Sequence, residues 1–350
     1  MFLSIHGTSH RIYIFVILAC LFSITIFAGI STGAVKFDLQ AFIHLLLSDS
    51  QTSSNDYAKQ ILLHIRLPRV IAAILVGGSL AICGAVMQGL FRNPLVDPGI
   101  VGVMSGASLA ASFSIVLGGA FMPSLFKSLG DYALPFMAFL GAWLMTLVLY
   151  RFSKRGGSLN IAAMLLIGIA LGALAGALTG LLTYAADDNQ LRSLTFWGMG
   201  SLAIFDWHKV SILFVVILFA TPLLAREIRL LDALMLGEKV AGHLGFNIER
   251  AKKRLIFLVA LLVGTSVSFA GGIAFIGLVV PHIVRGLVGS HHRYVFPASF
   301  IFGATLLCLA DMMARTVVAP AELPIGIITA MIGAPFLAYL VWRQMGGLRA

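Results

Sequence analysis

The chain has 350 residues and a formal net charge of +10, with 59% hydrophobic and only 11% charged residues. Soluble domains carry roughly 25% charged residues, so this composition excludes an ordinary water-soluble protein and indicates a membrane protein. No polar interval is long enough for a separate soluble domain, and we therefore expect residues 1–350 to form a single membrane domain.

Apolar runs follow one another along almost the whole chain. About 20 apolar residues cross the ~30 Å hydrocarbon core of a bilayer, and the sequence predicts an all-α polytopic protein with about ten transmembrane helices. The first run could be read as a secretory signal, but Ile12 to Ile30 exceeds the usual apolar region of about 7–15 residues, so we expect it to be retained. The predicted spans are 12–30, 68–91, 98–120, 133–151, 159–184, 204–225, 255–275, 277–288, 295–314 and 323–342.

The basic residues indicate the orientation of these spans. If the N-terminus is cytoplasmic, 16 of the 24 lysines and arginines fall on the cytoplasmic side, as the positive-inside rule requires. Ten spans then place both termini in the cytoplasm. This distribution accounts for the positive charge without nucleic acid, which we do not expect as a partner.

Glycines inside the spans are spaced as in closely packed membrane helices. Two series stand out, Gly77-Gly78 with Gly84 and Gly89, and a four-residue repeat from Gly168 to Gly180. Small residues at this spacing let helix backbones approach closely, so we interpret them as packing positions. Gly84-x4-Gly89-Leu90 also resembles Gly272-x4-Gly277-Leu278, which suggests an inverted repeat of the kind found in transporters.

Helix-breaking segments near the membrane boundary are predicted to line a pathway, because non-helical backbone at membrane depth survives only in protein or beside a cavity. These segments are 92–99, 271–272, Pro281 and 319–326.

Enzyme motifs are missing from the sequence: it has no phosphate-binding Gly-x4-Gly-Lys loop, no His-Glu-x-x-His and no Gly-x-Ser-x-Gly. We expect no catalysis, no metal site and no bound cofactor. His282 is interpreted as a structural residue, and the adjacent pair His291 and His292 as a solvated loop. The three cysteines lie in apolar runs and read as small hydrophobic residues.

An ion-coupled secondary transporter is the alternative that must be weighed. Such a carrier needs an ionisable residue buried in the membrane, and only Asp311 qualifies. Arg315 follows one helical turn later and is expected to form an ion pair with it, which leaves no obvious site for a coupling ion.

The longest cytoplasmic loop, residues 226–254, is amphipathic. Gly237 and Gly245 interrupt it, so we predict two short helices. They could lie on lipid, but a docking surface for a soluble partner explains the glycine breaks better.

Several motifs in order resemble the permeases of ATP-binding-cassette importers for iron-siderophores, haem and cobalamin. The motifs are Arg66 to Arg69 (RLPR), Gly84 to Gly102 (GAVMQGLFRNPLVDPGIVG), Met235 to Gly245 (MLGEKVAGHLG), Gly277 to Arg285 (GLVVPHIVR) and Ala321 to Gly326 (AELPIG). The resemblance covers most of the chain. The polar segment Ser48 to Asn55, before the second span, departs from the pattern.

The resemblance implies a permease subunit of an ATP-driven importer in the bacterial inner membrane. Its partners would be a second copy of the chain, two cytoplasmic ATPase subunits that use the ATP, and a periplasmic or lipid-anchored substrate-binding protein. The cargo would be a bulky metal chelate, with an iron-siderophore expected first and haem or cobalamin as alternatives.

The resemblance also implies roles for particular residues. Four match the segment that rests on each ATPase, three match outward arginines that dock the binding protein, and two match a cytoplasmic gate. These sets are Gly237, Glu238, Leu244 and Gly245 for ATPase coupling; Arg66, Arg69 and Arg315 for docking; and Asn93 and Leu95 for the gate.

Overall fold

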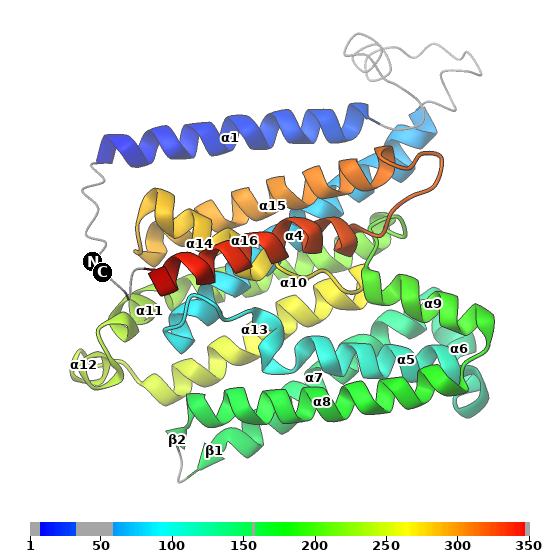
Figure 1. Ribbon diagram of the computed structural model, residues 1–350, viewed down its shortest axis with the longest axis horizontal. Helices are drawn as coiled ribbons and strands as arrows, with labels where there is room; N and C mark the ends of the chain where they lie inside the picture. Colours follow the sequence, from blue (N-terminus) through cyan, green and yellow to red (C-terminus); the bar gives the residue numbers. More distant parts are fainter. Residues whose placement is uncertain (1–7, 33–58, 156–157, 347–350) are drawn as a thin grey trace.

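Long helices that run nearly along one direction build the protein (Figure 1). The computed structural model describes residues 8–32, 59–155 and 158–346, so the polar segment 48–55 lies outside the described residues. The elements are α1 (Thr8–Ser31), η1 (Ile61–Arg66), α4 (Leu67–Phe91), η2 (Pro98–Val101), α5 (Val103–Phe121), α6 (Pro123–Leu129), η3 (Gly130–Tyr132), α7 (Ala133–Ser153), β1 (Lys154–Arg155), β2 (Ser158–Leu159), α8 (Ile161–Ala185), α9 (Asp188–Met199), α10 (Trp207–Arg226), α11 (Ile228–Met235), α12 (Glu238–His243), α13 (Ile248–Ala270), α14 (Ile276–Val288), α15 (His292–Thr316) and α16 (Ile325–Gly346).

The all-α prediction is confirmed, apart from the short antiparallel pair β1 and β2. Within the described residues, nine helices are long and apolar enough to cross a membrane. The predicted span 277–288 is the short helix α14, whose 13 residues reach only about 20 Å at 1.5 Å per residue. The nine long helices and the shorter apolar helix α14 together account for the ten predicted apolar segments.

Helix α13 ends earlier than predicted, at Ala270, because Gly271 adopts a positive φ of 71°. The non-helical backbone here is hydrogen-bonded to two distant segments. Ser201 donates to the Ala270 carbonyl, at 2.8 Å, and the Gly272 amide donates to the Trp197 carbonyl, at 3.1 Å. The Ile325 amide donates to the Gly200 carbonyl, also at 3.1 Å, so three chain segments meet at one backbone crossing that main-chain hydrogen bonds hold together.

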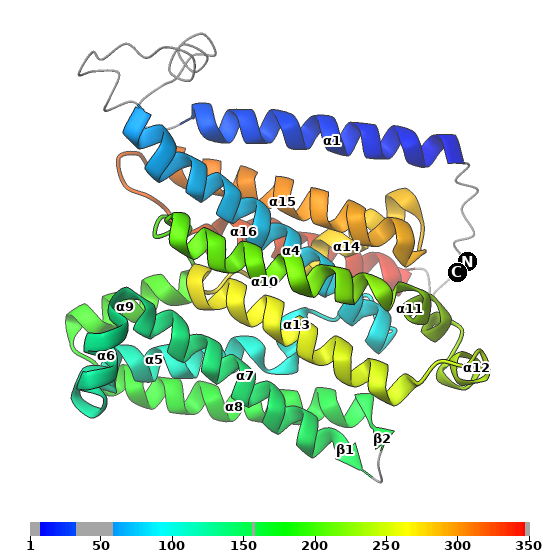
Figure 2. The same ribbon diagram turned by 180° about the vertical axis from the view of Figure 1, so that it is seen from behind.

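Helix α9 was not predicted as an element. Its sequence is polar at the start, and Asp187 and Gln190 form a reciprocal capping box that fixes its first turn. It lies beside α5 at the end of the bundle opposite α11 and α12 (Figures 1 and 2).

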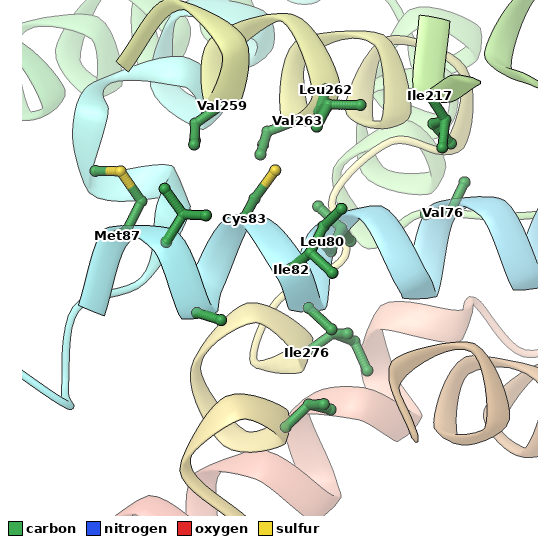
Figure 3. Close-up of a cluster of buried hydrophobic side chains, with 14 of the residues drawn as sticks. Val76, Leu80, Ile82, Cys83, Met87, Ile217, Val259, Leu262, Val263 and Ile276 are labelled. Carbon is green, nitrogen blue, oxygen red and sulfur yellow. The ribbon is translucent and has the colours of Figure 1, made fainter. Parts of the chain in front are cut away.

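Helix α4 is the centre of the bundle and is buried along most of its length. Cys83 and Val76 point toward α13 and α10, while Ile276 of α14 lies across the opposite face (Figure 3). Side chains here are small or medium-sized, and neighbouring helices approach α4 on all sides. Packing against α4 therefore holds the two faces of the bundle together.

The glycines of α4 allow these close approaches. A Cβ at Gly84 would overlap the carbonyl oxygen of Gly277, and one at Gly77 would overlap that of Gly303. The packing interpretation of this series is confirmed. The two copies of the Gly-x4-Gly-Leu motif also meet here, although the second begins in the turn before α14 rather than inside a span.

Replacing Gly84 by alanine is expected to destabilise the protein by about 3 kcal/mol, because the backbone of α14 has to move to admit one methyl group. Gly119→Ala is the matched control, since nothing lies within 4 Å of its added Cβ. The melting temperature of the purified chain in detergent measures the effect. A Gly84→Ala protein that melts with the control would contradict the close contact.

Candidate functional site

The segment between α11 and α12 presents apolar side chains to the outside. Leu236 is 69% exposed and Leu244 60%, and Met235 and Val240 are also exposed. The opposite face of α11 is buried against the bundle through side chains such as Leu231. The two predicted short helices of residues 226–254 are thus present, with an apolar outer surface.

Two glycines shape this segment. Gly237 has a φ of 115° and Gly245 a φ of 87°, a region that residues with a Cβ rarely adopt. Gly237 ends α11 and starts α12, and Gly245 follows α12 before the chain enters α13. Open space surrounds both positions. The glycines are therefore required for backbone conformation rather than for close packing.

Glu238 forms an ion pair with Lys252 of the same chain. Its Oε2 lies 2.8 Å from Nζ of Lys252, whose side chain is only 2% exposed. Glu249 lies 3.5 Å from the same ammonium and also accepts a hydrogen bond from the amide of Leu159. Burying an ammonium is costly unless it is paired, so Lys252 fixes α12 against α13.

The three arginines expected to point outward are buried. Arg66 is 4% exposed and donates to the carbonyls of Ile30 and Ser31, at 2.8 and 3.1 Å. Arg69 is 6% exposed, and the Arg315 side chain is 8% exposed. Their expected exposure is therefore wrong, whereas their docking role stays a prediction.

Two of these arginines are buried because both form ion pairs with the carboxylate of Asp311. Asp311 Oδ1 lies 2.8 Å from Nε of Arg69, and Oδ2 lies 3.1 Å from Nε of Arg315, which confirms the predicted Asp311 to Arg315 pair. Arg69 also contacts the half-exposed Glu322, at 2.9 Å. Arg315 donates in addition to the carbonyls of Gly29 and Thr32, which ties the end of α1 to α15.

The predicted gate residues lie in a turn after α4. Arg92 adopts a left-handed conformation with a φ of 49° and ends the helix. The Leu95 amide donates to Oδ1 of Asn93 at 3.0 Å, and this side-chain turn fixes the loop. Asn93 is exposed and Leu95 is half-buried.

A cavity of about 500 Å³ opens beside Asn93. Arg285 reaches into its wall, donating to the side chain of Gln88 and to the carbonyl of Ala85. Met235, at the end of α11, belongs to the same wall. The lining consists of Gln88, Arg92, Asn93, Pro94, Met235, His282, Arg285, Gly286, Gly289 and Ser290.

The histidines differ from one another. His282 lines the cavity and packs edge-on against Phe336, and the described residues contain no group of three side chains able to hold a metal ion. His291 is exposed as predicted, but His292 is fully buried, with Nδ1 2.7 Å from Asp232. The interpretation of His292 as a solvated residue is wrong, because its side chain is hydrogen-bonded to Asp232, 60 positions away in the sequence.

A family profile matches residues 21–343, nearly the whole chain. The chain belongs to the FecCD transport family. Two relatives in this transport family are permeases whose names state their cargo. The hemin transport system permease protein HmuU of Yersinia pestis is 45% identical, over 84% of this chain and 86% of its own length. The vitamin B12 import system permease protein BtuC of Vibrio cholerae is 42% identical, over 82% of this chain and 84% of its own length.

Solved structures agree with this membership. A structure assigned to a metal-chelate type ABC transporter in an inward-facing conformation matches with a TM-score of 0.80 and 33% identity, covering 93% of this chain and 97% of that chain. The expected fold of a multi-pass ABC importer permease is thereby confirmed.

Sequence reasoning about this FecCD chain missed three contributors. Glu322 pairs with Arg69, which is far away in the sequence, and Lys252 pairs with Glu238 across the loop that precedes α13. Met235 lines the cavity and also begins the exposed segment. A signal for Lys252 was available, because Glu249 precedes it by three residues at the start of a helix. No neighbouring residue in the sequence indicated that Glu322 would form an ion pair with Arg69.

Proposed function

We propose that this chain is the membrane-spanning permease subunit of an ATP-driven importer for a bulky metal chelate. The observation that carries the proposal is the double position of Met235. It lines the cavity beside the gate residue Asn93, and it also begins the exposed apolar segment that a soluble ATPase would grip. A push on that segment would therefore reach the gate directly.

Two ATPase subunits and a substrate-binding protein complete the proposed assembly in the inner membrane. Each ATPase docks on one copy of the segment 235–245, and both termini lie on that cytoplasmic side. In this assignment Gly237 and Gly245 set the backbone, Leu244 supplies contact area, and Glu238 holds α12 in place through Lys252. The chain carries no bond chemistry, and ATP is used by the partner.

The binding protein is proposed to dock at the opposite end, above the buried arginines. Arg66, Arg69 and Arg315 contribute there by holding α1, α15 and Glu322 in place, with Glu322 reaching the surface. The three arginines outnumber Asp311 and Glu322 by one positive charge, and this net charge favours encounter with an acidic partner. Asn93 and Leu95 form the gate behind the cargo.

A second copy of the chain is proposed to pack on α8. This helix is the least buried of the apolar spans, and nothing described lies within 4 Å of a Cβ added at Gly176 or Gly180. The close packing that its glycine series predicts is thus missing within the described chain. Small residues at four-residue spacing suit contact between two copies in lipid.

We expect a cysteine at Gly176 to cross-link two copies through a short thiol-reactive linker, after Cys20, Cys83 and Cys308 have been replaced by alanine. Leu218→Cys, which is also exposed on an apolar span, is the control and should remain monomeric on a denaturing gel. Equal cross-linking of both positions would remove the support for α8 as the contact.

Haem or cobalamin is the proposed cargo class, a metal held in a tetrapyrrole-type macrocycle. The two relatives are permeases for hemin and vitamin B12, and each is more than 40% identical to this chain. Our first expectation of an iron-siderophore has no such support and remains a prediction. The secondary-transporter alternative loses its one carboxylate, because both oxygens of Asp311 are paired with arginines.

Transport in proteoliposomes tests the proposal. The permease is reconstituted with its ATPase, and hemin or cobalamin is supplied on the binding protein. We expect uptake that requires ATP and is indifferent to proton and sodium gradients. Uptake driven by a gradient without ATP would overturn the assignment.

A further inference from the structure

A second cavity, unrelated to the cargo pathway, lies where α1, α11 and α15 meet at the α12 end of the bundle. Its volume is about 780 Å³, and four arginines line it against a single aspartate. These are Arg11, Arg226, Arg229 and Arg293, with Asp232. We propose that this cavity binds the phosphate headgroup of an anionic phospholipid, with cardiolipin as the best fit because it carries two phosphates.

The charge of the cavity is not neutralised within the described chain. No ion pair joins any of the four arginines to a carboxylate among these residues. Asp232 is occupied by His292, from which it accepts hydrogen bonds from both the amide and Nδ1. Burial raises the pKa of Asp232, but these hydrogen bonds outweigh it and hold the pKa below its ordinary value, so the carboxylate stays ionised and engaged.

Arg11 gives an independent indication of a missing ligand. Its guanidinium lies 4.4 Å from the centre of the Tyr294 ring, which holds it in place without using its N–H donors. The Nε atom is buried and has no hydrogen-bond partner in the described part of the chain. A buried donor without a partner is costly, and a phosphate oxygen is the acceptor that four convergent guanidinium groups favour.

The depth of the cavity matches a lipid headgroup rather than a soluble ligand. Three of the arginines stand at the ends of apolar spans: Arg11 near the start of α1, Arg226 at the end of α10 and Arg293 at the start of α15. Apolar side chains such as Ile12 and Phe219 are exposed along the same helices and would meet the acyl chains. Basic pockets between helices at this level are suited to anionic lipid headgroups.

Topology alone does not explain the arrangement. Arginines that serve only to orient the chain can point in any direction at the cytoplasmic surface. Here they converge on one cavity from four helices, α1, α10, α11 and α15, beside the end of α11 where the exposed segment 235–245 begins.

Lipid binding to the purified, delipidated full-length chain tests the inference without any transport assay. Native mass spectrometry would count cardiolipin, phosphatidylglycerol or phosphatidylethanolamine bound per chain during a titration. We expect cardiolipin to bind in preference to the zwitterionic lipid. Arg229→Gln with Arg293→Gln should weaken cardiolipin binding about 30-fold, at about 1 kcal/mol for each charge.

Arg151→Gln with Lys154→Gln is the matched control, because both residues are exposed at the same end and lie outside the cavity. It should change the affinity less than about twofold, while the melting temperature verifies that both variants fold. If the double variant is unstable, Arg229→Gln alone should still weaken binding about fivefold. Equal losses in the control, equal binding of phosphatidylethanolamine, or displacement of the lipid by millimolar inorganic phosphate would each overturn the lipid site.

Discussion

Replacing Leu236 and Leu244 by aspartate is expected to abolish ATP-driven uptake while leaving the isolated permease folded. Both side chains are more than half exposed, so the change costs the permease little. In a complex with the ATPase the same carboxylates would be buried without partners, and truncating one central contact typically costs about 2 kcal/mol or more. Co-purification of the ATPase and uptake of hemin in proteoliposomes measure the two effects.

Val317→Asp is the control for this pair, since Val317 is 64% exposed at the opposite end of the bundle. It should leave ATPase co-purification unchanged. Full ATPase association by the Leu236→Asp, Leu244→Asp protein would show that the exposed apolar segment is not the docking surface. Glu238→Lys is less informative, because it sets a positive charge against the buried ammonium of Lys252 and disturbs α12 itself.

Asp311→Asn should be the most destabilising polar substitution tested, lowering the free energy of unfolding by about 3–5 kcal/mol. It leaves the buried guanidinium groups of Arg69 and Arg315 without the carboxylate that pairs both. Thermal melting of the purified variant in detergent measures the loss. Glu322→Gln, on a half-exposed side chain, should cost no more than about 1 kcal/mol.

A triple substitution at the Asp311 cluster separates the effect of its buried charges on stability from the effect of side-chain packing. Asp311→Leu with Arg69→Met and Arg315→Met removes the buried charges together and should recover much of the stability, because uncharged side chains of similar volume need no pairing. If Asp311→Asn melted like the native chain, the ion-pair network would not hold α4 to α15. For the same reason, Arg69→Glu and Arg315→Glu variants are expected to unfold, so they would not report on docking of the binding protein.

Features that depend on local sequence were predictable. Hydropathy located the apolar helices within a few residues, and the glycine breaks at 237 and 245 predicted the two short helices α11 and α12. The pair of Asp311 and Arg315 followed from helical spacing. Family motifs placed Asn93, which lies in the wall of a real cavity.

Features that depend on long-range contacts were not predictable. Arg69 was expected to be exposed because the family resemblance matches it to an outward arginine, yet it is buried against Asp311, which lies 242 residues later. His292 was misread in the same way, since its partner is on a different helix. Helix α9 was missed because its stability comes from a cap and from packing against α5, not from an apolar run. Burial of a charged residue is decided by tertiary pairing, which no single segment encodes.

The backbone crossing of residues 197–201, 270–272 and 325 bears on how a permease can evolve to accept a different cargo. Its bonds join amides to carbonyls, and they require glycine at positions 200, 271 and 272, because an added Cβ at each would lie within 2.7 Å of a carbonyl oxygen of the crossing. Substitutions along the pathway can therefore reshape what the protein admits while the frame that carries the helices keeps its geometry.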